Sequence, residues 1–270
     1  MAQPLSPLSI SDVLEWENAQ DTRNEFCRGA VFAIGDTRRV HGLVAGNLSV
    51  ALKVPLRGPP CRAFGVSMKV QVANDAELGA LAEHVRGTAR DVDDLVYVSA
   101  ERGVGGGVIS AGRPLRGTRG YVGELGHLVV RPGGRACYCG SRGCWETEVG
   151  EAALCRALGL AEDTPRGVVV AELRSLATVP RPGPLDEFAE WLAVGLVTVV
   201  NILAPELVVL GDLFTALPRG VVDHVRGLVQ ERSLVSRAVG GVRIETSPLG
   251  RDATLVGAAE LAFEPVLGAV

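Results

Sequence analysis

Residues 137–146 read Cys-Tyr-Cys-Gly-Ser-Arg-Gly-Cys-Trp-Glu, and nine residues separate this stretch from His127. Zinc prefers four ligands in a tetrahedron, and one imidazole with three thiolates makes a closed, structural shell of that kind. Two glycines lie inside the stretch, and glycine tolerates the positive φ angles that a tight loop around a metal requires. The spacing therefore predicts a structural zinc site within residues 127–146, with the ligands His127, Cys137, Cys139 and Cys144.

Two carboxylates flank the predicted metal loop. Glu124 lies three residues before His127, and Glu146 lies two residues after Cys144. A cation that fixes the loop would also fix these polar groups in space. We therefore expect Glu124 and Glu146 to form part of a binding site.

Composition excludes several classes of protein. The formal net charge is −4 and the arginines are interspersed with acids, so the chain lacks a footprint for direct nucleic-acid contact. The N-terminus lacks the profile of a secretory signal, and the six cysteines then indicate reduced thiols rather than a disulfide scaffold. The apolar run at 191–204 contains Asn201 and falls short of the roughly 20 residues that span a bilayer. We predict a cytoplasmic protein.

Short apolar runs alternate with segments of helical spacing. Buried strands are expected at residues 70–72, 95–98, 107–110, 207–210 and 242–244. Helices are expected at residues 77–84, 149–158, 188–199 and 253–263. Glycine-rich turns or loops are expected between the second and third strands and at residues 211–212. This alternation predicts an α/β fold with two lobes, residues 1–94 and 95–270.

Taken together, these motifs resemble one family, the ROK proteins, named for repressors, open reading frames and sugar kinases. Residues 137–146 match its zinc-loop signature C-x-C-G-x-x-G-C-x-E, and residues 120–127 match its G-x-x-G-E-x-G-H. Residues 72–76 resemble its N-D-A segment at the start of a helix. The resemblance covers roughly residues 31–265 and implies the two-lobed actin- and hexokinase-like fold, of the ribonuclease H-like type.

The resemblance also implies a sugar site. In the family's sugar kinases the aspartate of N-D-A is the general base, which takes a proton from a sugar hydroxyl as that oxygen attacks ATP. Asp75 occupies this position. The implied sugar-binding residues are Asn74, Asp75, Glu124, His127 and Glu146. His127 would serve metal and sugar together if each ring nitrogen faces one of them. Taken alone, Asn74 and Asp75 are better explained as a helix cap; beside the Glu-His-zinc motif, the sugar site is favoured.

The nucleotide-binding turns depart from the kinase pattern. No D-x-G-x-T motif precedes Asn74, and only 73 residues precede it, so we expect an incomplete N-terminal lobe. The kinase turn G-T-G-x-G-G-G is replaced at residues 99–107 by Ser-Ala-Glu-Arg-Gly-Val-Gly-Gly-Gly. There Glu101 would bring negative charge toward anionic phosphates. If Mg·ATP binds, the implied residues are Gly103, Gly105, Gly106, Gly107 and Gly211; the alternative is a tight turn at 105–107.

The altered turn resembles that of the family's transcriptional regulators more than that of its kinases. Such regulators place a winged helix-turn-helix before the sugar-sensing part, but residues 1–30 show no paired amphipathic helices and no basic recognition helix. We therefore predict a zinc-stabilised, sugar-sensing domain of the regulator type that forms a homodimer or homotetramer. The alternatives are a glucokinase-like, ATP-dependent sugar kinase with Asp75 as general base, and a ligandless family member.

Overall fold

The computed structural model describes residues 24–27, 30–33, 73–117, 122–178 and 183–267. The chain divides into two compact units, residues 1–72 and 73–270. In the first unit, β1 (Asn24–Cys27) and β2 (Ala30–Ala33) form an antiparallel hairpin. The strand expected at 70–72 lies outside the described residues.

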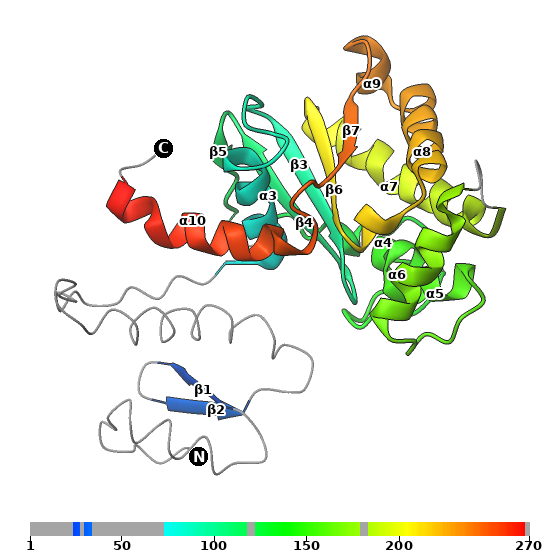
Figure 1. Ribbon diagram of the computed structural model, residues 1–270, viewed down its shortest axis with the longest axis horizontal. Helices are drawn as coiled ribbons and strands as arrows, with labels where there is room; N and C mark the ends of the chain where they lie inside the picture. The colour runs from blue at the N-terminus through cyan, green and yellow to red at the C-terminus, as the bar shows by residue number, and fades with distance from the viewer. Residues whose placement is uncertain (1–23, 28–29, 34–72, 118–121, 179–182, 268–270) are drawn as a thin grey trace. The chain divides into compact units, whose positions relative to one another are not determined.

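The second unit is built on a five-stranded mixed sheet with the order β5-β4-β3-β6-β7 (Figure 1). Its strands are β3 (Leu95–Ala100), β4 (Val104–Ser110), β5 (Arg113–Pro114), β6 (Leu207–Asp212) and β7 (Arg243–Thr246). Strands β3, β6 and β7 are parallel, whereas β4 runs antiparallel to both of its neighbours. Strands and helices alternate along this unit, which confirms the predicted α/β class.

Helices cover both faces of the sheet (Figure 1). They are α3 (Asp75–Val85), α4 (Trp145–Val149), α5 (Glu151–Ala157), α6 (Arg166–Ser175), α7 (Asp186–Leu203), α8 (Arg219–Arg232), α9 (Leu234–Ala238) and α10 (Ala253–Leu267), with the short 3-10 turn η2 (Leu125–His127). Helix α3 packs against α10 and against strands β3 and β4. The predicted lobe boundary after residue 94 would separate α3 from these strands; that boundary stays a prediction.

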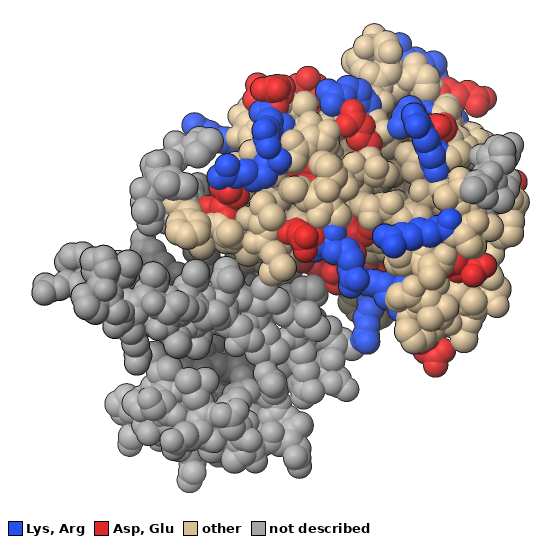
Figure 2. Space-filling view, viewed as in Figure 1, with Lys and Arg blue, Asp and Glu red and all other residues tan. Residues whose placement is uncertain are grey.

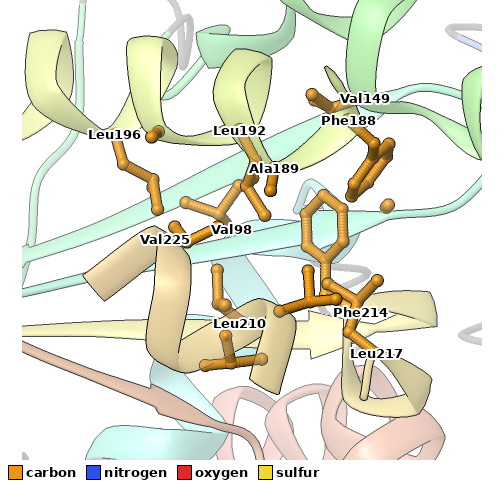
Figure 3. Packing of buried hydrophobic residues seen from close by; sticks show 14 of the residues in the cluster. Val98, Val149, Phe188, Ala189, Leu192, Leu196, Leu210, Phe214, Leu217 and Val225 are labelled. Atoms are coloured by element: carbon orange, nitrogen blue, oxygen red, sulfur yellow. The ribbon is translucent and has the colours of Figure 1, made fainter. Parts of the chain in front are cut away.

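Strand β3 is buried on both faces. Its side chains alternate between the faces, so Val98 joins the larger core cluster beneath α7 and α8, while Tyr97 joins the smaller one beneath α3. In the larger cluster Phe188 of α7 meets Phe214 edge to face, with ring centroids 6.4 Å apart (Figure 3). Burial on both faces explains why β3 is a continuous apolar run in the sequence.

Helix α7 contains most of the apolar run at 191–204, and its buried face lies in the larger core cluster. No helix in the described part of the chain combines the length and the apolarity needed to cross a membrane.

On the face shown in Figure 2, the Lys and Arg side chains are interspersed with Asp and Glu.

The turn expected at residues 105–107 is wrong, because these glycines lie within β4 and pair with β3. A Cβ added at Gly107 would lie 2.2 Å from the carbonyl oxygen of Ala76 in α3. A Cβ added at Gly106, on the opposite face, would lie 2.5 Å from the side chain of Leu125 in η2. The bare strand therefore allows α3 and η2 to approach the sheet closely from opposite sides.

Two further expectations are corrected. Residues 211–212 are not a loop but the last two residues of β6, where they pair with β3. The helix expected at 149–158 is α5 and begins only at Glu151, because Gly150, whose backbone is extended, separates it from α4. A Cβ on Gly150 would lie 2.7 Å from the carbonyl oxygen of Glu146, so close packing explains the glycine at this break.

Replacing Gly107 by alanine is expected to lower the free energy of unfolding, since the added carbon would lie 2.2 Å from a backbone oxygen of α3. Overpacking of this kind typically costs about 1–3 kcal/mol. Gly227→Ala in α8 is the matched control, because the added carbon there meets nothing within 4 Å. Urea unfolding of both variants measures the effect. If Gly107→Ala were as stable as the wild type, the close contact of α3 with β4 would be refuted.

Candidate functional site

Four potential metal ligands gather in the loop between η2 and α4. The ligand atoms of His127, Cys137, Cys139 and Cys144 all lie within 4.8 Å of one another. The Sγ atoms of Cys139 and Cys144 are 3.7 Å apart, and Cys137 Sγ is 3.6 Å from His127 Nδ1. A tetrahedron with Zn–S bonds of about 2.3 Å has edges of about 3.8 Å. The cluster has the spacing and the donor set to hold a metal ion.

Glycines shape this loop as the sequence predicts. Gly140 and Gly143 have φ angles of 92° and 73°, in the region that favours glycine. At Gly143 an added Cβ would also lie 1.7 Å from the carbonyl oxygen of Arg131. Backbone bonds from Cys137 N to Ser141 O (2.9 Å) and from Gly143 N to Arg135 O (2.8 Å) close the turn.

The three thiols differ in acidity. Burial, together with a hydrogen bond to Glu146, raises the pKa of the Cys137 thiol well above its ordinary value. Burial also raises the pKa of Cys144, whereas a hydrogen bond from the backbone of Ser141 lowers the pKa of Cys139. A cation deprotonates the thiols that it binds. Metal uptake by this loop therefore releases protons.

The two ring nitrogens of His127 face different groups. Nδ1 faces the sulfur cluster and lies 3.7 Å from Glu146 Oε1. Nε2 lies 3.2 Å from the hydroxyl of Tyr138 and 3.9 Å from Glu124 Oε2. This is the orientation that a histidine serving a metal on one side and a ligand on the other requires.

Asn74 and Asp75 begin α3 and cap it. Asn74 Oδ1 accepts a hydrogen bond from Ala76 N at 2.9 Å, and Asp75 Oδ1 accepts from the same N–H at 2.8 Å. The helix-cap interpretation is thus confirmed. It leaves room for binding as well, because an N-cap contact occupies only part of what an amide or carboxylate can accept.

Glycines also bring Asp75 and Glu146 to the same part of the molecule. A Cβ added at Gly105 would lie 3.7 Å from Asp75 Oδ1, and one added at Gly103 would lie 2.5 Å from Glu146 Oε2. The two carboxylates therefore lie beside positions that are only two residues apart at the start of β4. Glu146 also lies 3.7 Å from His127 Nδ1. Carboxylates of this kind are acceptors that suit a ligand rich in hydroxyl groups.

Near the carboxyl ends of the parallel strands β3 and β6, two carboxylates flank the guanidinium group of Arg166. Arg166 of α6 lies 3.0 Å from Asp212 Oδ2 and 3.1 Å from Glu151 Oε1. Burial raises the pKa of Asp212 to about 6; the charges of Arg166 and Arg251 oppose this shift and the nearby Glu101 adds to it. This is the region where the sequence places the altered nucleotide-binding turn.

Contacts within the protein account for the glycines that the resemblance assigns to Mg·ATP. Gly103 makes room for Glu146, while Gly105 and Gly107 make room for α3 and Gly106 for η2. Gly211 makes room for Tyr97, since a Cβ there would lie 1.9 Å from the tyrosine hydroxyl. These glycines do not by themselves indicate a nucleotide site.

Sequence reasoning missed Arg166, Glu151 and Asp212 as a charged cluster, and it gave Tyr138 no role. No motif marks Arg166, which lies 46 residues from Asp212 along the chain. Tyr138 could have been found from its position between two predicted metal ligands.

The sequence profile described as ROK family matches residues 18–264. The match covers most of the chain, so the chain belongs to the ROK family, as its motifs predict. Its structural neighbours are ROK hexokinases and glucokinases with the actin-like ATPase fold, which confirms the predicted fold.

Both regulators and kinases are among the relatives. The xylose repressor of Bacillus subtilis is 30% identical over 201 residues, which cover 74% of this chain and 52% of the repressor. The glucokinase of Streptomyces coelicolor is 30% identical over 223 residues, which cover 74% of this chain and 69% of the kinase. A ROK family glucokinase from Streptomyces griseus, solved with glucose and AMPPNP, superimposes with a TM-score of 0.61 at 30% identity, covering 73% of this chain and 69% of that one. The chain spans about half the length of the xylose repressors that it matches.

The raised pKa of Asp212 predicts that the contribution of this carboxyl to the free energy of unfolding falls as the pH rises from about 4 to about 6. The folded carboxyl, with a pKa of about 6 against an ordinary 3.8, binds a proton more tightly than the unfolded one. The native state therefore holds more protons in this window, and deprotonation destabilises it. Guanidinium unfolding of wild type and Asp212→Asn at several pH values should show a difference that changes across the window. Exposed Glu172→Gln is the control; a constant difference for Asp212→Asn would contradict the assignment.

The cysteine cluster is expected to bind one zinc ion per chain. In a competition titration against a chromophoric chelator, Cys144→Ala should lose stoichiometric binding, because a closed site needs all four ligands. Cys155→Ala is the matched control, since Cys155 is buried in the core but lies outside the cluster. Equal zinc binding by both variants would exclude the cluster as the site.

Proposed function

We propose that this chain is a sugar-binding ROK protein of the transcriptional-regulator type, in which structural zinc orders the sugar site. The ligand is a hexose, a pentose or an amino sugar. One observation carries the proposal: Nδ1 of His127 faces the cysteine cluster while Nε2 faces away from it, beside Glu124. A metal on one side of the ring would thus hold the other side toward a ligand.

Carboxylates support a sugar as the ligand. Asp75 and Glu146 lie beside Gly105 and Gly103. Glu146 lies 3.7 Å from Nδ1 of His127, and Glu124 lies 3.9 Å from its Nε2. A carboxylate accepts several hydrogen bonds at fixed directions, which suits the adjacent hydroxyl groups of a sugar. The glucokinase structure with glucose, from a relative of 30% identity, agrees with this class of ligand.

Zinc suits the metal loop because three cysteines and one histidine complete a closed tetrahedral shell. His127, Cys137, Cys139 and Cys144 would hold the ion, and zinc would supply a cross-link rather than chemistry. Glu146 accepts a hydrogen bond from Cys137 Sγ at 2.7 Å. A cross-linked loop would therefore restrain both His127 and this carboxylate.

Charge favours a sensor over a kinase. Near the carboxyl ends of β3 and β6, the three carboxylates of Glu101, Glu151 and Asp212 face two cations, Arg166 and Arg251. A triphosphate placed beside these carboxylates would be repelled unless further cations offset them. The xylose repressors among the relatives agree with the sensor. In such a regulator, sugar occupancy would shift the population of conformations.

The second candidate is an ATP-dependent sugar kinase of the glucokinase type. The position of Asp75 at the start of α3, next to β4, favours it, because a general base must reach the sugar hydroxyl. The glucokinases among the relatives favour it too. Whether the protein is a dimer or a tetramer, and whether it is cytoplasmic, stay predictions.

Calorimetric titration with D-glucose, D-xylose and N-acetyl-D-glucosamine separates the two candidates when paired with an assay of ATP turnover. We expect one of these sugars to bind without turnover of ATP. Glu146→Gln should weaken the affinity for that sugar by about 10- to 100-fold, because it removes a hydrogen bond to a charged group. Exposed Glu172→Gln should bind as the wild type does. Turnover that Asp75→Asn abolishes, with sugar affinity retained, would establish the kinase instead.

A further inference from the structure

Tyr138 is an exposed aromatic residue that nevertheless makes a specific contact. Its side chain is 82% exposed, and it lies between two of the cysteines in the metal loop. Its hydroxyl is 3.2 Å from His127 Nε2, and the two rings meet edge to face with centroids 5.3 Å apart. The phenol therefore sits on the nitrogen that faces away from the sulfur cluster.

An imidazole nitrogen offers one hydrogen-bonding position in the ring plane, either a single N–H or a single lone pair. Tyr138 Oη fills this position on Nε2, whichever tautomer is present. Glu124 Oε2, at 3.9 Å from Nε2, is beyond hydrogen-bond distance. A sugar hydroxyl that bonds to Nε2 must therefore displace the tyrosine.

The loop allows this displacement without refolding. The backbone around Tyr138 is closed by the bonds Cys137 N to Ser141 O and Gly140 N to Cys137 O, at 2.9 and 3.1 Å. The largely exposed side chain can rotate into solvent while this backbone stays in place. Rotamer changes of exposed side chains take picoseconds to nanoseconds.

We propose that Tyr138 is a gate on His127: its hydroxyl occupies Nε2 in the free protein and yields that position to one hydroxyl of the sugar. This inference rests on the proposed sugar-binding function. It adds Tyr138 as a residue that determines which sugars bind. A sugar with a hydroxyl at this point replaces the lost hydrogen bond, whereas a deoxy analogue leaves the tyrosine in place.

Tyr138→Phe tests the gate, because it removes the competing hydroxyl and keeps the ring. By calorimetry, the sugar that binds best among D-glucose, D-xylose and N-acetyl-D-glucosamine should bind the variant about 2- to 10-fold more tightly, the worth of one net hydrogen bond. Among the monodeoxy analogues of that sugar, the one lacking the hydroxyl that meets Nε2 should bind both proteins equally. Tyr138→Ala should also tighten binding of the parent sugar, and zinc content should be unchanged in both variants. Unchanged or weaker affinity of Tyr138→Phe would overturn the gate.

A second measurement needs no sugar. In ¹⁵N NMR spectra of the zinc-loaded free protein, Tyr138→Phe should shift the His127 Nε2 resonance and speed exchange of its proton with water. No change would overturn the gate even if the wild type binds sugar well, so failure of the gate is distinguishable from failure of the proposed function. Absence of sugar binding by wild type and variant alike would overturn both.

Discussion

The candidate site depends on strand β4, which has glycines at the points where α3 and η2 pack against it. Glycine at position 107 allows α3 to approach β4 on one face, and glycine at position 106 allows η2 to approach on the other. Helix α3 begins at Asp75 and is capped by Asn74, while η2 ends with His127. Asp75 and His127, about 50 positions apart along the chain, thus lie on elements that pack against the same strand. The packing is possible because the glycines have no side chain that would collide with these elements.

The metal loop provides the second constraint. It returns the chain from η2 to α4 and places three cysteines beside the imidazole of His127. Glu146 follows the last cysteine and contacts the first, so the loop and the carboxylate are coupled. Trp145, between Cys144 and Glu146, is buried in the same core cluster as Phe188 and Phe214 and so anchors the end of the loop. Packing therefore determines where His127 and Glu146 lie, and a bound cation would restrict their motion.

Local motifs were predictable from the sequence, and long-range contacts were not. The metal cluster and the cap at Asn74 have fixed spacings along the chain, so their residues could be named in advance. The glycines of β4 were misread as a turn, because turns and close approaches both require glycine. The ion pair of Arg166 with Asp212 joins segments 46 residues apart and leaves no local pattern. Helices α6 and α8 were also missed. Helix α6 buries only Val169 and Leu173, which is a weak pattern, whereas the buried residues of α8 recur at helical spacing and could have been recognised.

We propose above all that zinc bound by the cysteine loop orients His127 and Glu146 to bind a sugar. The most direct test compares the sugar affinity of the zinc-loaded protein with that of the same protein after chelation, with circular dichroism to verify that the fold persists. Our account predicts that chelation abolishes or strongly weakens binding while the sheet and its helices remain folded. Equal affinity before and after metal removal would contradict it.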